Sequence, residues 1–392
     1  MMTSRKSLFR KTCIFAFCLL MIGAFVNCSN SGSDSPPTPP IVVPPPDSGL
    51  SFDSWNIPTQ DTPMLGLSTA EGWSTPKLVG SPVNFLADGG WTDSVTTTRD
   101  GLELYFAYGR GDGHRFLFVD NAMVQTGPKR TDSVDTDYLQ LYKATLSSKG
   151  YAISHVDVGL GSETLGAPAV NATKDLMAFV SYSGPSRKIK IAGLNTEGTA
   201  QFVLNADAPI NNPGNLSGCH DDNPFIRGTI NSGIIYWQSR RTDAAGVNCP
   251  LETDKAAPSR YFYSVITNGV ASAPHAIPGL DVVGGSTYEA SFSENGTSAY
   301  WVRVKGNPDG IFGIMTADSS DGLNFSNPRP LIWISNFSPN WDGRVSDIGE
   351  PNVVETSQGS VMFFRCLIAK GPDVNNKPAN QQFKICVSKK NK

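Results

Sequence analysis

Short apolar runs alternate with polar turns along most of the chain, and few stretches have the spacing of an amphipathic helix. Runs of this length, separated by Asn-Gly, Asp-Gly and Ser-Gly dipeptides, are typical of β-hairpins. The stretch from Tyr288 to Val302 begins with an acid, turns at Asn295-Gly296 and ends in aromatic and branched residues. Glycine is favoured in such turns because it adopts a positive φ at little cost. The pattern therefore predicts an all-β protein built from hairpins.

This hairpin recurs along the chain. Each copy is a short strand, a polar turn and a second strand rich in aromatic and β-branched residues, and the five copies are marked by Asp93, Ala167, Asp222, Glu289 and Glu350. The markers are 74, 55, 67 and 61 residues apart, and long insertions after Tyr108 and Arg240 explain most of the scatter. Hairpins of a second type lie between the copies, and a displaced version of that type covers residues 67–79.

Four strands in every repeat predict a β-propeller, because a single small sheet cannot bury both of its faces and must stack against its neighbours. The direct count gives five blades. The displaced hairpin is expected to offer outer strands to the fifth blade, so that both ends of the domain close the ring. A six-bladed ring would result if residues 52–90 made a further blade with the final strand. A β-sandwich is the remaining alternative.

The amino-terminal segment is expected to lie outside this fold. Four basic residues precede an apolar run from Ile14 to Val26, which has the layout of a secretory signal and is too short for a good membrane-spanning helix. Cys28 follows directly, and Phe-Val-Asn-Cys resembles a bacterial lipobox, although Phe25 and Asn27 depart from its usual residues. We therefore expect a signal peptide over 1–27, a lipidated tether rich in Ser and Pro over 28–51, and the propeller over 52–392. An ordinary signal peptide that contains a cysteine is the alternative.

Charge and cysteine content narrow the possible partners. The net charge is −3 and no basic cluster lies beyond the signal, so we expect no nucleic-acid ligand. Four cysteines remain in the predicted domain: Cys219, Cys249, Cys366 and Cys386. In an exported chain an even number suggests two disulfides, and the two pairings between cysteines close in sequence are favoured over the other pairings and over four reduced thiols. No Cys-x-x-Cys pair occurs and His220 has no second histidine nearby, so neither a metal nor a cofactor is expected.

The repeats resemble those of two groups of propellers. TTTRDGLELYF and SFSENGTSAYW are similar to the repeats of TolB and WD40-like propellers, which are usually six-bladed and usually bind partners. The sequences around Asp222, Glu289 and Glu350 also resemble parts of the five-bladed glycoside hydrolases of the arabinanase and β-xylosidase type. In that family the inner strands carry Asp, Asp and Glu over the first three blades. Here Ala167 stands in the second copy, with Glu163 as an approximate substitute, and Glu289 arrives one blade late.

Acids at the same place on several inner strands would meet near the axis of a propeller. Four of the five copies carry an acid at what the alignment takes as the equivalent position, Ala167 being the exception. Repulsion and burial separate the pKa values of neighbouring carboxyl groups, and an inverting glycosidase holds its two groups roughly 6.5–9.5 Å apart. The catalytic hypothesis takes Glu289 as the acid and Asp93 or Asp222 as the base. The alternative is that these acids cap strand ends or solvate a funnel.

Two functions follow as expectations. The first is a monomeric binding or scaffolding lipoprotein of the bacterial cell envelope, held in the outer membrane or at the cell surface by its lipid and presenting the propeller to a protein or carbohydrate. Its ligand-binding candidates are Glu350, Trp91 and Trp341. The second is a glycoside hydrolase acting on arabinan or xylan. Neither a Gly-x-Ser-x-Gly elbow nor a phosphate loop is present, so esterase and nucleotidase activity have no support.

Overall fold

The computed structural model describes residues 57–61, 64, 66–84, 91–109, 116–119, 122–125, 139–160, 163–181, 187–195, 200–205, 210–211, 219, 221–242, 249, 258–280, 287–303, 311–335, 345–355, 359–368 and 382–391. All of them belong to the second of two compact units, Thr38–Lys392. In this part of the chain there is no α-helix, and so no helix that could cross a membrane. The predicted signal peptide, the predicted lipidation site Cys28, and the residues His220 and Trp341 lie outside the described residues.

The described residues form five antiparallel blades, which we number in chain order. Blade 1 contains β4 (Trp91–Thr97), β5 (Glu103–Gly109), β8 (Leu139–Ser147) and β9 (Gly150–His155). Blade 2 contains β10 (Leu165–Val170), β11 (Leu176–Ser181), β12 (Lys188–Leu194) and β13 (Ala200–Asn205). Blade 3 contains β14 (Asp222–Gly228), β15 (Ser232–Ser239), β16 (Arg260–Thr267), β17 (Val270–Ala271) and β18 (His275–Ala276).

The last two blades take strands from both ends of the described chain. Blade 4 contains β19 (Thr287–Phe292), β20 (Ser298–Arg303), β21 (Gly313–Ser319), β22 (Phe325–Ile334) and β2 (Leu67–Thr69). Blade 5 contains β23 (Val345–Glu355), β24 (Gly359–Ile368), β25 (Gln382–Asn391), β3 (Lys77–Val79) and β1 (Thr59–Gln60). A separate hairpin, β6 (Phe116–Val119) and β7 (Ala122–Gln125), lies in the insertion after Tyr108.

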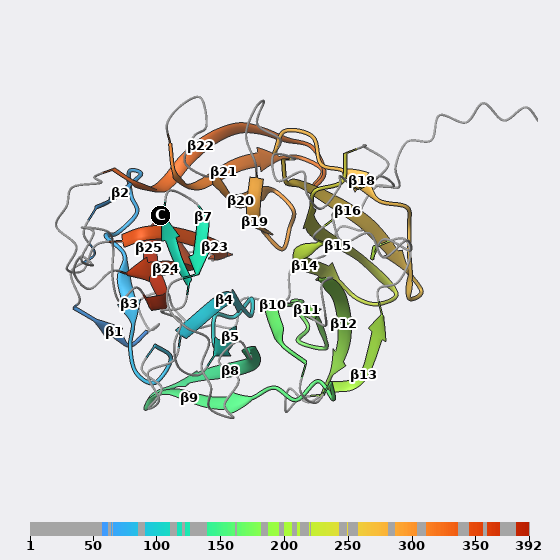
Figure 1. Ribbon diagram of the computed structural model, residues 1–392, viewed down its shortest axis with the longest axis horizontal. Helices are drawn as coiled ribbons and strands as arrows, with labels where there is room; N and C mark the ends of the chain where they lie inside the picture. The colour runs from blue at the N-terminus through green and yellow to red at the C-terminus, as the bar shows by residue number, and fades with distance from the viewer. Residues whose placement is uncertain are drawn as a thin grey trace, which may run out of the picture. The chain divides into compact units, whose positions relative to one another are not determined.

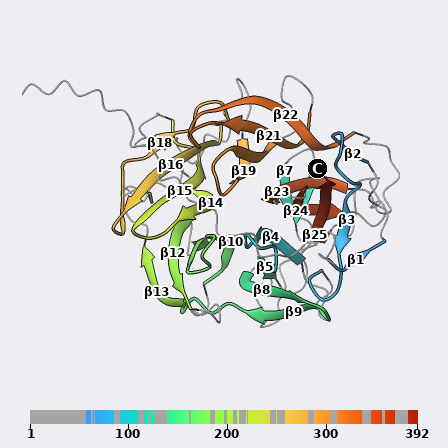
Figure 2. The ribbon, with the colours of Figure 1, turned by 180° about the vertical axis from the view of Figure 1, so that it is seen from behind.

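The first strand of every blade lies next to the axis of the ring, where β4, β10, β14, β19 and β23 surround the centre (Figures 1 and 2). This arrangement confirms the predicted five-bladed β-propeller. A sixth blade and a β-sandwich are both wrong for the described residues, because the segments between 57 and 84 join blades 4 and 5.

Ring closure differs in one respect from the prediction. In β3, Leu78 pairs with Cys386 of β25 and so extends blade 5, as expected. In β2, Ser68 pairs with Trp333 of β22, so the displaced segment is shared between two blades instead of forming a hairpin on one. Strand β22 is ten residues long, and an uncovered edge of that length would be open to pairing with other chains. The buried Asn84 side chain fastens the closure by donating to the carbonyl of Ile385 at 2.7 Å.

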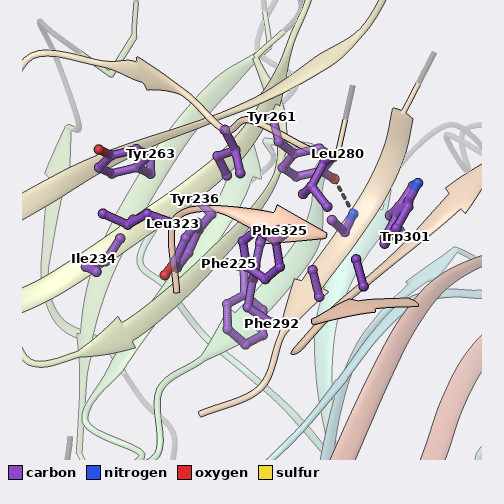
Figure 3. Close-up of a cluster of buried hydrophobic side chains, with 14 of the residues drawn as sticks. Phe225, Ile234, Tyr236, Tyr261, Tyr263, Leu280, Phe292, Trp301, Leu323 and Phe325 are labelled. Carbon is purple, nitrogen blue, oxygen red and sulfur yellow. Dashed lines mark hydrogen bonds between the residues drawn. The ribbon is translucent and has the colours of Figure 1, made fainter. Parts of the chain in front are cut away.

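Apolar side chains fill the spaces between neighbouring blades. Among the described residues one buried cluster lies at each of the five blade junctions, including the junction of blades 1 and 5 that closes the ring. Figure 3 shows the cluster between blades 3 and 4, in which Tyr236 stacks on Phe292 with ring centroids 4.0 Å apart. Trp237 and Trp301 are fully buried in such clusters, so they serve packing between blades. Packing between blades thus accounts for most aromatic strand residues.

Both predicted disulfides are confirmed. Cys219 bonds to Cys249 across a Cα separation of 4.8 Å, and Cys366 bonds to Cys386 across 6.1 Å. The second bond links neighbouring strands of blade 5, the blade that receives β3. It therefore reinforces the blade on which ring closure depends.

Candidate functional site

Each inner strand bulges at the same place near the axis. The pairing with the second strand shifts register there in all five blades. One residue of every bulge adopts a left-handed backbone with φ between 43° and 55°: Ser94, Ala167, Asn223, Glu289 and Glu350. This conformation is unfavourable for residues other than glycine, and it persists only where the surrounding structure enforces it. Repetition in five blades marks the bulges as a built feature of the centre.

The bulges enclose a cavity on the axis. Its empty volume is about 320 Å³, including space open to solvent at its mouth. Three consecutive residues from each inner strand line it: Ser94–Thr96, Ala167–Ala169, Asn223–Phe225, Glu289–Ser291 and Glu350–Asn352. Glu289 and Glu350 supply the two acidic side chains of this lining.

The bulge geometry corrects the predicted alignment of the acids. Glu289 and Glu350 occupy the left-handed position of their bulges. Asp93 and Asp222 stand one residue before that position, at the place that Tyr288 and Gly349 hold in blades 4 and 5. Each aspartate accepts a hydrogen bond from the backbone N–H of the following residue, at 3.0 Å for Asp93 and 2.9 Å for Asp222. The prediction of four equivalent acids is therefore wrong, because two of them cap the bulge instead of lining the cavity.

Four carboxyl groups gather around one buried arginine. Arg365 of β24 lies 3.2 Å from Glu289, 3.5 Å from Asp93, 3.7 Å from Glu350 and 3.1 Å from Asp347, measured between nitrogen and oxygen. The Arg365 side chain is 7% exposed, and no acid of the cluster exceeds 19%. We call these five residues the Arg365 cluster. It joins blades 1, 4 and 5.

Backbone and hydroxyl groups hold the two cavity glutamates in place. The Ser94 hydroxyl donates to Glu350 at 2.6 Å, and the backbone N–H of Glu350 donates to Glu289 at 3.0 Å. The backbone N–H of Glu289 in turn donates to the side-chain oxygen of Gln238 at 2.9 Å. Gly349 lies against the cluster, where a Cβ atom would collide with both Glu289 and Arg365. These contacts hold both glutamates in position without a ligand.

Burial makes the cavity acids easier to protonate than usual. It raises the pKa of Glu289 to about 7, with Arg365 opposing the shift and Asp347 and Asp93 adding to it. Burial also raises the pKa of Glu350 well above its ordinary value, reinforced by Asp93 and Glu289. The pKa of Asp347 rises for the same reason, against the attraction of Arg365. Glu289, which lines the cavity, is therefore suited to exchange its proton near neutral pH.

The other sequence candidates lie apart from this cluster or cannot be placed. Asp222 is 5% exposed and bound to Arg187. Glu163 bonds Ser181 and lies 3.3 Å from Lys190, within blade 2. Trp91 is described only through its backbone, which pairs with Gly109.

Sequence reasoning missed two members of the cluster. Arg365 stands alone among apolar residues in the stretch Val-Met-Phe-Phe-Arg-Cys-Leu-Ile, and an isolated charge in a buried strand was an available signal. Asp347 lies two residues before Gly349 on β23, so the two share a face of the strand. Within the described residues, no group of three or more His, Cys, Asp or Glu side chains could hold a metal ion.

No protein-family profile and no curated protein matches the chain. Solved structures do match it, and they include both kinds of propeller that the sequence resembles. An α-L-arabinofuranosidase from Podospora anserina matches with 10% identity and a TM-score of 0.44, over 79% of this chain and 94% of that one. A family 117 glycoside hydrolase from Zobellia galactanivorans matches with 11% identity and a TM-score of 0.47, over 82% and 89%. A putative TolB from Agrobacterium tumefaciens matches with 12% identity and a TM-score of 0.34, over 65% and 87%.

Proposed function

We propose that this chain is a lipid-anchored protein of a bacterial cell envelope whose propeller binds a carbohydrate in the axial cavity. The observation that carries the proposal is the cavity itself, with Glu289 and Glu350 at two of its bulges and both held by Arg365. Rigid, inward-facing polar groups among apolar walls are the usual composition of a small-molecule site.

The Arg365 cluster is too costly to be explained by the fold alone. Burying charged groups carries a desolvation cost that ion pairing repays only partly, and apolar residues often serve stability as well or better. Gln238 of β15 pairs with Asp222, and Arg365 of β24 pairs with Gly349. Asp222 and Gly349 each stand directly before the left-handed residue of their bulge, so blade 3 carries a neutral glutamine at the position that Arg365 occupies in blade 5. Gln238 still bonds the neighbouring blade through the backbone N–H of Glu289. A propeller junction therefore does not require an arginine here.

The lining favours a ligand rich in hydroxyl groups. Ser94, Thr96, Asn223, Ser291 and Asn352 offer hydrogen-bond donors and acceptors, and proline and alanine faces separate them. Carboxyl groups accept from sugar hydroxyls, and the excess of acids over Arg365 disfavours phosphorylated or other anionic ligands. The chemistry fits a neutral sugar or an amino sugar.

A glycan array followed by calorimetry tests this binding. We expect the unaltered protein to bind at least one glycan, and Glu350→Gln and Glu289→Gln to weaken that binding at least tenfold. Asp318→Asn serves as the control, because Asp318 is 48% exposed and paired with Arg329 away from the cavity lining. The absence of any glycan ligand, or unchanged binding by both glutamate variants, would refute the proposal. An envelope-protein array tests for a protein ligand in the same way.

Hydrolysis is a second candidate, and the raised pKa of Glu289 favours it. A cavity carboxyl group with a pKa of about 7 suits a general acid. Of the two predicted bases, Asp93 is the one that Arg365 bridges to Glu289, whereas Asp222 is bound to Arg187. Asp93 caps its bulge, so it would have to act from beside the cavity. Incubation with arabinan and xylan should release sugar, and Glu289→Gln should abolish the release. Failure of the unaltered protein to cleave either polymer would leave binding as the function.

The lipid anchor is tested separately. Cells that express the protein are grown with labelled palmitate, which we expect to label the unaltered chain but not Cys28→Ala. An unlabelled natural chain would exclude the anchor while leaving the cavity proposal intact.

A further inference from the structure

A second cavity lies next to the first one. Its empty volume is about 650 Å³, including open solvent, and it shares Phe225 and Asn352 with the axial cavity. It is lined by residues at the far ends of three inner strands and by the turns that follow them: Thr97 and Arg99, Phe292 to Asn295, and Asn352 to Glu355, together with Val170, Ala172 and Phe225. Phe225 and Asn352 thus separate the two cavities.

Two turns of the same design supply the charged groups of this second cavity. In Thr98–Gly101 and Ser293–Gly296, the first hydroxyl donates to the third side chain, at 2.6 Å and 2.8 Å. The glycines take φ values of 69° and 76°, and their N–H groups close the turns at 2.8 Å in both cases. The second residues, Arg99 and Glu294, take no part in these bonds. Their side chains are therefore available to the cavity that they line.

Both side chains carry a buried atom that lacks a partner. One terminal nitrogen of Arg99 and one oxygen of Glu294 have no hydrogen bond, and in the described part of the chain no ion pair joins these residues. Burying a polar atom without a partner costs roughly 1–3 kcal/mol, so such atoms are rare in native proteins. Burial also raises the pKa of Glu294 to about 7, although Arg227 and Arg99 oppose the shift. Opposite charges thus line one cavity without neutralising each other directly.

We propose that the second cavity binds an amino acid with an apolar side chain, whose carboxylate pairs with Arg99 and whose ammonium group pairs with Glu294. A bound zwitterion would place an opposite charge beside each of these two side chains. Phe292, Phe225 and Val353 offer an apolar surface for the side chain of the ligand. Glu355, which also lines the cavity, disfavours a ligand that is only anionic.

Calorimetry with the purified full chain tests the site. The probes are L-leucine, L-phenylalanine and L-aspartate, with leucine methyl ester and N-acetyl-leucine as ligands that lack one charge. We expect leucine or phenylalanine to bind, and loss of either ligand charge to weaken binding at least tenfold. Binding should also weaken as pH falls from 8 to 5, because protonation of Glu294 removes the partner of the ammonium group.

The same measurement on variants assigns the contacts. Arg99→Gln and Glu294→Gln should each lower the affinity at least tenfold, whereas Arg329→Gln, at an exposed ion pair, should not. Arg99→Lys retains the charge and should bind more tightly than Arg99→Gln, which separates a binding role from a folding defect. The proposal is overturned if no amino acid binds, if inorganic phosphate binds as well as leucine, or if both glutamine variants bind like the unaltered protein.

Discussion

The two cavities share Phe225 in their lining, but they differ in how their buried charged side chains are paired. Beside the axial cavity, one arginine lies among four carboxyl groups, and hydrogen bonds from the backbone and from Ser94 hold the glutamates. In the second cavity, Arg99 and Glu294 lie apart, and each retains a buried atom with no partner in the described chain. The charges of the first arrangement are paired within the protein, whereas we propose that those of the second are paired by a bound molecule. Substitutions should therefore have opposite effects on stability in the two places.

Arg365→Met should have the largest effect. It leaves four carboxyl groups without their shared cation, and breaking a buried ion pair typically costs about 3–5 kcal/mol. Urea denaturation at pH 7 measures the loss, which should shrink at pH 5 because the acids can take up protons. Arg329→Met, at an exposed pair, should cost less than about 1 kcal/mol. Equal losses in the two variants would show that the cluster is no more tightly bound than a surface pair.

Phe225→Ala should have the next largest effect. Phe225 is 8% exposed and packs in the cluster between blades 3 and 4, so truncation should cost about 3 kcal/mol. It should also join the two cavities, because both are lined by this ring. Calorimetry should then show that a ligand of one cavity alters the affinity for a ligand of the other. Independent binding in the variant would mean that Phe225 is not the barrier between them.

Glu289→Gln should change how stability depends on pH. A carboxyl group with a native pKa of about 7, above its ordinary 4.5, binds its proton more tightly in the folded chain. The contribution of Glu289 to stability is therefore fully present below about pH 4.5 and is lost as pH rises to about 7. Between pH 5 and pH 8, the free energy of unfolding should decrease by about 2 kcal/mol less in the variant than in the unaltered protein. A denaturation series across that range measures it, and an unchanged slope would exclude Glu289 as a source.

Arg99→Met and Glu294→Met should have the smallest effect and the opposite sign. Each removes a buried atom that lacks a partner, so the free energy of unfolding should stay unchanged or rise by up to about 1 kcal/mol. Thermal denaturation without ligand measures the change. A loss above about 2 kcal/mol in both variants would show that these side chains are already satisfied within the protein, and the contrast between the cavities would fail.

The fold was largely predictable because turn chemistry is local. Polar turns, among them Asp100-Gly101 and Asn295-Gly296, together with the second-strand runs located all five blades, and the spacing of four cysteines was enough to pair them. Closure was predicted only in part, since no local signal tells β2 to pair with β22 when β3 pairs with β25.

The site was harder to predict because a bulge changes which residue faces the axis. Asp93 and Glu289 occupy similar places in the sequence repeats, but a shift of one residue turns a side chain to the other face of a strand. Sequence alone gives no sign of that shift. The gathering of acids from blades 1, 4 and 5 on Arg365 also depends on the closed ring, which brings distant strands together.

The seam between β3 and β25 has a consequence for how the molecule assembles. Asn84 and Ile385 are 301 residues apart in sequence, and their bond can form only after the chain between them has been made. Contacts between such distant residues are slow to form. Until β3 docks on β25, the outer edge of blade 5 stays unpaired. If the chain is exported unfolded, as the proposed lipid anchor implies, the ring would close only after export.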